Sequence, residues 1–69
     1  MDERLLALIK EYRSFLRRTF RLGEKEEIWF GFYCDGSTAI ASETWVFDTW
    51  PNYDFDAMQK TITEKMEKN

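Results

Sequence analysis

The sequence predicts a small α+β domain: a helix, then an antiparallel β-hairpin or three-stranded meander, then a second helix. Three observations lead to this prediction. Apolar residues recur at helical spacing near the N-terminus, a β-branched and aromatic run ends in Asp-Gly, and a second apolar stripe lies near the C-terminus. We expect one domain, residues 1–69, with both helices packed on one face of the sheet.

The first helix is predicted over residues 3–21. We expect Asp2 to cap its start, where a carboxylate also suits the helix dipole. Gly23 is expected to supply the left-handed residue that ends many helices. One apolar stripe runs along the helix at i, i+3 and i+4 spacing, formed by Leu5, Leu8, Ile9, Tyr12, Leu16 and Phe20.

The central strands are predicted from their composition and from one turn. Residues 26–34, EEIWFGFYC, are rich in strand-forming types, and Asp35-Gly36 suits a two-residue type I′ turn. A second strand is predicted over residues 37–49, broken into two near Ser42-Glu43, where a bulge or bend would keep Glu43 out of the core.

A two-residue turn sets the hairpin register, which places Phe32 opposite Ala39 and Phe30 opposite Ala41. Because side chains alternate along a strand, one sheet face is then predicted to be the core face, with Ile28, Phe30, Phe32, Ala39 and Ala41. The opposite face carries Trp29, Tyr33 and Ile40, which we expect to meet solvent or a partner.

The second helix is predicted over residues 54–67, with Asp54 as its cap. Its apolar stripe is formed by Phe55, Met58, Ile62 and Met66.

The composition predicts a protein without catalytic activity. The chain has no histidine, so it has neither a Ser-His-Asp triad nor a Cys-His pair, and its three glycines do not form a phosphate-binding loop. Its single cysteine, Cys34, leaves no intrachain disulfide, and one thiol without histidine does not make a usual zinc site. We therefore expect no enzyme activity, no metal and no cofactor.

The unpaired cysteine is typical of a reducing compartment. The N-terminal stretch MDERLLALIK begins with charged residues, so we do not expect it to be a signal peptide, and no stretch approaches the length of a membrane span. We expect a cytoplasmic protein, or one that acts in the cytoplasm of a host cell, with no membrane partner.

Charge is unevenly distributed along the chain, whose net charge is −3. Residues 1–22 hold six basic and three acidic residues, whereas residues 24–56 hold eight acidic residues and one lysine. The negative total argues against non-specific nucleic-acid binding. The basic residues near the end of the first helix are Arg13, Arg17, Arg18 and Arg21. They could interact with the helix dipole and the hairpin acids, contact phosphate, or contact a partner protein.

The strongest functional clue is ETWVFDTWPNYDFD, residues 43–56, which has five aromatic residues, four acids and no base. These aromatic residues either all pack in the core or form, at least in part, an exposed acid-rimmed surface. We expect the second, because exposed apolar patches and surface tryptophans are typical of protein interfaces. The predicted partner-binding residues are Trp45, Phe47, Asp48, Trp50, Tyr53, Asp54 and Asp56.

We therefore expect a non-enzymatic interaction module that binds a larger protein with a basic surface. Small acidic chains of this kind are common among phage and mobile-element inhibitors of host nucleic-acid-processing or defence proteins, the anti-CRISPR type among them. Two alternatives stay open. One is a homodimer or assembly subunit joined through Trp29, Tyr33 and Ile40, and the other is a nucleic-acid-binding module that uses the arginines of the first helix.

Overall fold

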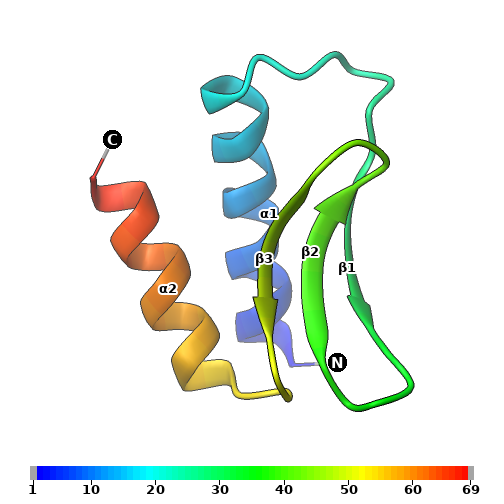
Figure 1. Cartoon of the computed structure of the whole chain (residues 1–69). Helices are drawn as coiled ribbons and strands as arrows, with labels where there is room; N and C mark the ends of the chain where they lie inside the picture. The colour runs from blue at the N-terminus through cyan, green and yellow to red at the C-terminus, as the bar shows by residue number, and fades with distance from the viewer. Residues whose placement is uncertain (1, 69) are drawn as a thin grey trace. The chain divides into compact units, whose positions relative to one another are not determined.

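The structure is a computed structural model that describes residues 2–68. Two helices flank three strands in the chain, and the strands form one antiparallel sheet of order β1-β2-β3 (Figure 1). This confirms the α+β prediction in its three-stranded form. The elements in chain order are α1 (Glu3–Thr19), β1 (Ile28–Phe32), β2 (Thr38–Ser42), β3 (Val46–Trp50) and α2 (Phe55–Glu67).

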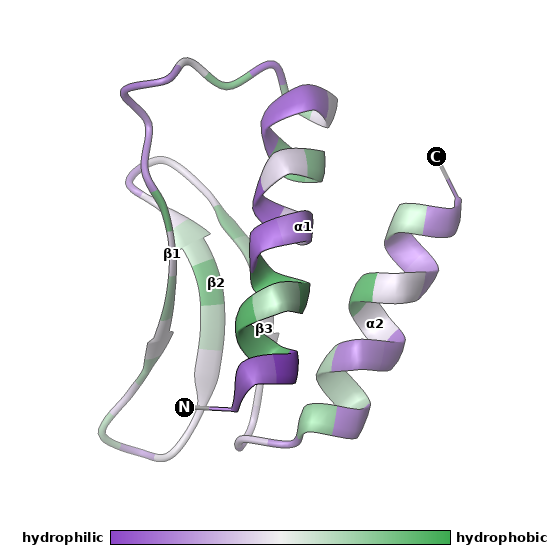
Figure 2. Ribbon diagram, turned by 180° about the vertical axis from the view of Figure 1, so that it is seen from behind, coloured by the Kyte–Doolittle hydropathy of each residue, from purple (hydrophilic) through white to green (hydrophobic). Residues whose placement is uncertain are grey.

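The described chain divides into two compact units. The helical unit holds α1 and α2, and the sheet unit, Gly23–Asp54, holds the three strands. In Figure 2, hydrophilic and hydrophobic positions alternate along both helices, as expected for amphipathic helices, and the middle of β2 is hydrophobic.

The helical unit buries one stripe from each helix. The predicted stripe of α1 is buried except for Leu8, which is half-buried, and Phe20, which is exposed because it lies beyond the last helical residue. On α2 the innermost side chains are Met58 and Ile62, which are fully buried. A cation–π contact joins the starts of the two helices, with the Arg4 guanidinium 4.3 Å from the centre of the Phe55 ring. The buried side chains are Leu5, Ile9, Tyr12, Leu16, Met58 and Ile62.

The start of α1 follows its prediction and its end does not. The Arg4 backbone N–H donates to Oδ1 of Asp2 at 2.9 Å, so Asp2 is the N-cap. At the other end, Arg21 takes the left-handed conformation, with a φ of 54°. The backbone N–H of Leu22 donates to the Arg17 carbonyl at 3.0 Å. This is the Schellman pattern with Arg21 in the left-handed position, so the prediction for Gly23 was wrong by two residues.

The β1–β2 loop has three residues instead of the predicted two. The Gly36 N–H donates to the Tyr33 carbonyl at 3.0 Å, and the Tyr33 N–H donates to the Ser37 carbonyl at 2.8 Å. Gly36 has a φ of 91°, as expected for a three-residue hairpin loop in which a left-handed residue follows a turn. The predicted two-residue turn was therefore wrong, and the register is shifted by one residue.

That shift exchanges the two faces of β2. Phe30 now pairs with Ile40 and Trp29 pairs with Ala41. Ile40 is 0% exposed, on the opposite face from Trp29 and Tyr33, so its prediction as part of an exposed interface was wrong. We call the two faces the Ile40 face and the Trp29 face. Residues of the Ile40 face are Ile28, Phe30, Phe32, Thr38, Ile40, Ser42, Asp48 and Trp50, and those of the Trp29 face are Trp29, Gly31, Tyr33, Ala39, Ala41, Val46 and Thr49.

The predicted break of the second strand is confirmed, because β2 ends at Ser42 and β3 begins at Val46. The β2–β3 pairing contains a bulge, with Ile40 opposite Asp48 and Ala41 opposite Val46, which leaves Phe47 as the extra residue. All five residues of β2 are buried, so this strand is the centre of the sheet unit.

Candidate protein-binding surface

Strand β1 carries exposed aromatic side chains on both faces of the sheet. On the Trp29 face, Trp29 is 43% exposed and Tyr33, directly after the strand, is 52% exposed. On the Ile40 face, Phe32 is 55% exposed. The central strand of the same sheet is buried, so the exposed aromatic surface lies along the edge of the sheet that β1 forms.

Phe32 belongs to an aromatic cluster, which we define as Phe30, Phe32 and Tyr53. The Phe30 and Phe32 rings meet edge to face with their centroids 5.1 Å apart. The Tyr53 ring tilts against Phe32 at 5.9 Å. Both distances are typical of favourable aromatic pairs. The contact fixes the segment after β3 against the end of β1 while Phe32 and Tyr53 stay exposed.

A second exposed aromatic side chain is held by the β2–β3 turn. The Ser42 hydroxyl oxygen accepts hydrogen bonds from the backbone N–H of Trp45 at 3.2 Å and, more weakly, from that of Thr44 at 3.4 Å. The Ser42 N–H donates to the Trp45 carbonyl at 2.7 Å, and the Thr44 hydroxyl donates to Oε1 of Glu26 at 2.9 Å. This bonding fixes the backbone at Trp45, whose side chain is 54% exposed.

The structure separates the predicted partner-binding residues into an exposed set and a buried set. Trp45, Tyr53 and Asp54 are exposed in the sheet unit, and Asp56 is exposed at the start of α2. Phe47, the bulged residue of β3, is half-buried.

Trp50 and Asp48 are buried, so the prediction that they form part of an exposed surface was wrong. Trp50 pairs with Thr38 and Asp48 pairs with Ile40, which places both side chains on the Ile40 face. Trp50 is only 8% exposed there, and Asp48 is buried as well. The bulge at Phe47 sets which residues of β3 point to this face.

Sequence reasoning missed Phe32, because alternation along β1 assigned it to the core face together with Ile28. It does lie on the same face as Ile28, as predicted, but it is the last residue of the strand and is exposed. The position next to a hairpin loop was the available signal, since strand ends are covered less completely than strand centres.

The hairpin loop adds a fixed negative charge close to the end of β1. Oδ1 of Asp35 accepts hydrogen bonds from the Ser37 hydroxyl at 2.7 Å and from the Ser37 N–H at 3.0 Å. These bonds, the hydroxyl first, lower the pKa of Asp35 below its usual 3.8. Asp35 is therefore negatively charged at neutral pH and can attract basic residues of a partner.

The predicted arginine row is shorter than expected. Arg13, Arg17 and Arg18 lie on α1, but Arg21 lies beyond its end in the left-handed conformation. Arg17 is half-buried, and the other three are exposed. Because Arg21 has left the helix, only Arg13 and Arg17 keep the predicted spacing of four on one helix face.

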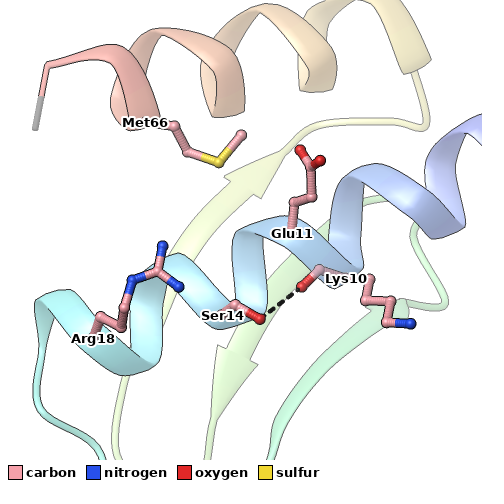
Figure 3. Close-up of a pocket in the computed structure, with 5 residues that line it drawn as sticks. All are labelled: Lys10, Glu11, Ser14, Arg18 and Met66. Carbon is pink, nitrogen blue, oxygen red and sulfur yellow. Dashed lines mark hydrogen bonds between the residues drawn. The ribbon is translucent and has the colours of Figure 1, made fainter.

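Arg18 lines a pocket of about 390 Å³ in the helical unit, between α1 and α2 (Figure 3). The Ser14 hydroxyl in this pocket donates to the Lys10 carbonyl at 3.4 Å. The pocket is open to solvent, and its lining includes the acidic Glu11 as well as the basic Lys10 and Arg18, so it is not a purely cationic site that would favour an anion. Its lining residues are Lys10, Glu11, Ser14, Arg18 and Met66.

Within residues 2–68, no three acidic or cysteine side chains come together as a group that could hold a metal ion. Cys34 is a free, exposed thiol at the hairpin loop. Neither of the two described helices has the length and the apolar character needed to cross a membrane.

Comparisons of this chain with protein-family models, curated proteins and solved structures gave no match. The function is therefore inferred from the residues and their geometry.

Proposed function

We propose that this protein is a non-enzymatic interaction module that binds a larger protein with a basic surface through the exposed aromatic residues of its sheet unit. One observation carries the proposal. Five large aromatic side chains of a 32-residue unit, Gly23–Asp54, are more than two-fifths exposed. Aromatic side chains of this size are the usual anchors of protein interfaces. The five residues are Trp29, Phe32, Tyr33, Trp45 and Tyr53.

Two of these anchors are held in place before a partner arrives. The backbone N–H of Trp45 donates a hydrogen bond to the Ser42 hydroxyl in the β2–β3 turn, and the Tyr53 ring packs on Phe32. A side chain or backbone that is already ordered loses less entropy on binding, so more of the contact free energy is available for affinity.

The charges around the anchors favour a basic partner. Exposed carboxylates lie next to the aromatic residues in the chain, with Glu43 two residues before Trp45 and Asp54 directly after Tyr53. Asp35 adds a charge at the hairpin loop. Acidic groups around an apolar centre steer a basic surface towards it and raise the association rate more than the final affinity.

Within this class, the narrower hypothesis is an inhibitor, of phage or mobile-element type, that covers a functional surface of a host nucleic-acid-processing or defence protein. Its support is the small size and acidic composition of the chain. A surface of anchored aromatic residues suits occlusion of a protein surface better than imitation of a phosphate backbone, which needs a regular array of negative charge.

The test is affinity capture from a lysate of the source cell or its host with paired double variants. Trp45→Ala/Tyr53→Ala removes two exposed aromatic residues of the sheet unit. Leu6→Ala/Phe20→Ala removes two similarly exposed apolar residues of the helical unit and is the matched control. We expect a partner that the wild type and the control retain and the first variant loses, with both variants folded by circular dichroism. Equal retention by both variants, or no partner with the wild type, contradicts the proposal.

A further inference from the structure

Strand β1 has a free hydrogen-bonding edge. It lies at the end of the sheet order β1-β2-β3, and no strand within residues 2–68 pairs with its outer side. The Tyr33 N–H donates to the Ser37 carbonyl, so Tyr33 and Ser37 form a hydrogen-bonded pair. Such pairs alternate with non-hydrogen-bonded pairs along an antiparallel ladder, so the backbone N–H and C=O groups of Ile28, Phe30 and Phe32 point away from β2.

The two edges of this sheet are built differently. The outer edge of β3 carries a bulge at Phe47 and ends before Pro51, and both features block the addition of another strand. The β1 sequence, IWFGF, contains no proline and no charge, and its pairing with β2 is regular over all five residues. An apolar, regular edge strand without these features is a site for strand addition.

We propose that β1 pairs antiparallel with β1 of a second copy of this chain, about a twofold axis that passes through Phe30. The outward groups of Phe30 then bond to those of the partner's Phe30, and Ile28 lies opposite the partner's Phe32. The two three-stranded sheets become one six-stranded sheet. The pairing is isologous, so it closes as a dimer and leaves the two β3 edges outermost.

We infer this register of the two β1 strands because, on the Trp29 face, it places a large side chain of one copy opposite a small residue of the other. With the axis at Phe30, Trp29 of each copy lies opposite the partner's Gly31 at a non-hydrogen-bonded pair, where side chains come closest. A tryptophan over a glycine of the neighbouring strand covers exposed backbone and is a favourable pair. The Trp29 indole already leans over Gly31 of its own chain, since a Cβ on Gly31 would lie 3.9 Å from Cδ1 of Trp29.

The charges beyond the strand ends agree with the antiparallel direction. Lys25 lies three residues before β1 and Asp35 three residues after it, so the pairing brings the strand end that carries Lys25 to the strand end that carries the partner's Asp35. Both side chains are exposed, and Asp35 is charged at neutral pH.

The area available indicates a weak dimer. A fully buried aromatic side chain removes about 150–250 Å² from solvent, so the half-exposed Trp29, Phe32 and Tyr33 offer roughly 300 Å² per copy. Two copies with their backbone edges then reach the lower end of specific interfaces, roughly 1,000 Å² in total. We therefore expect a dissociation constant in the micromolar range.

The test is sedimentation velocity of the full chain with reductant, from low to high micromolar concentration. We expect the weight-average mass to rise towards the dimer as concentration increases. Trp29→Lys should remain monomeric, because a lysine on an edge strand opposes strand addition. Trp45→Lys is the matched control, since it makes the same change at an exposed tryptophan outside β1, and it should dimerise like the wild type. Phe32→Lys replaces Trp29→Lys if that variant does not fold.

Three results overturn the inference: a wild type that is monomeric at high micromolar concentration, equal loss of dimer in both tryptophan variants, or a β1 edge that pairs only with a different protein. The dimer would cover Trp29, Phe32 and Tyr33, three of the five aromatic residues of the proposed function, so the two inferences share part of one surface. Their tests remain distinguishable, because sedimentation of Trp29→Lys reports loss of the dimer and lysate capture with Trp45→Ala/Tyr53→Ala reports loss of the partner.

The register has its own test. Cα atoms of a hydrogen-bonded antiparallel pair are about 5.5 Å apart, inside the disulfide range of about 4.4–6.8 Å. Phe30→Cys in a Cys34→Ser background should therefore form a cross-linked dimer on mild oxidation. Trp45→Cys in the same background should stay monomeric. Cross-linking at position 45 but not at position 30 rules out the proposed axis.

Discussion

Replacing Gly36 with alanine tests the three-residue hairpin loop that sets the register of the sheet. Gly36 has a φ of 91°, a conformation that residues with a Cβ rarely adopt. A Cβ at this position would meet no atom of the described residues within 4 Å, so alanine brings no steric clash with that part of the chain. The whole cost is therefore the backbone preference of an L-residue, which is about 1–2 kcal/mol in the left-handed region.

Gly23→Ala is the matched control, because Gly23 is also exposed and a Cβ there also meets no described atom within 4 Å, but its φ is not positive. At such a site alanine lowers the entropy of the unfolded chain and stabilises by about 0.4–1 kcal/mol. The two substitutions should thus shift stability in opposite directions.

The assay is urea denaturation followed by tryptophan fluorescence and by circular dichroism. For a domain of this size, about 1 kcal/mol corresponds to a change of about 4–8 °C in the melting temperature, so Gly36→Ala is also visible in a thermal scan. The reasoning is refuted if Gly36→Ala is as stable as Gly23→Ala, because the loop would then not hold Gly36 in the left-handed conformation.

Three further predictions follow from single residues. Thr38 is fully buried and its hydroxyl has no hydrogen-bond partner within residues 2–68, so Thr38→Val should raise the unfolding free energy by about 1 kcal/mol, and a lower melting temperature would contradict this. Arg21 has a φ of 54°, so Arg21→Gly should stabilise by about 1 kcal/mol in urea denaturation, whereas a loss would show that its side chain matters more than its backbone. The Arg4 side chain is the main cause of the lowered pKa of Asp2. Because that pKa is lower in the folded state, the Asp2 carboxylate stabilises the fold above the usual value of 3.8, and this stabilisation is lost as pH falls through the folded pKa. Asp2→Asn keeps a good helix cap but cannot titrate, so its unfolding free energy should fall less steeply below pH 3.8 than that of the wild type. Identical acid titrations of variant and wild type would refute this role.

The helices were predictable because their signals are local. Buried side chains of α1 follow the spacing of the apolar residues, and Asp2 caps the helix as its position in the sequence indicates. The end of α1 was less predictable, because Arg21 takes a conformation that favours glycine and so gives no signal of its own.

The sheet was predictable in its strands and not in its register. Asp-Gly occurs in both two-residue and three-residue hairpin loops, and the choice between them shifts β2 by one residue. Since side chains alternate along a strand, one residue was enough to move Ile40 from the expected exposed face to a fully buried position.

The surplus of aromatic residues was visible in the sequence, but which of them are exposed was not. The bulge at Phe47 turns Trp50 and Asp48 to the Ile40 face, and nothing in the local sequence marks that bulge. Trp45 lies in the turn between β2 and β3, and Tyr53 lies after the end of β3. Both are exposed because of these positions in the fold, which the local sequence does not reveal.

The most direct test of the proposed interaction surface is site-specific photo-crosslinking in cells, which captures a partner whatever its identity. A benzophenone amino acid replaces Trp45 in one variant and the similarly exposed Leu6 of α1 in the control. The proposal predicts a discrete cross-linked product with another protein from position 45 and none from position 6. Equal products from both positions, or no product from position 45, would contradict it.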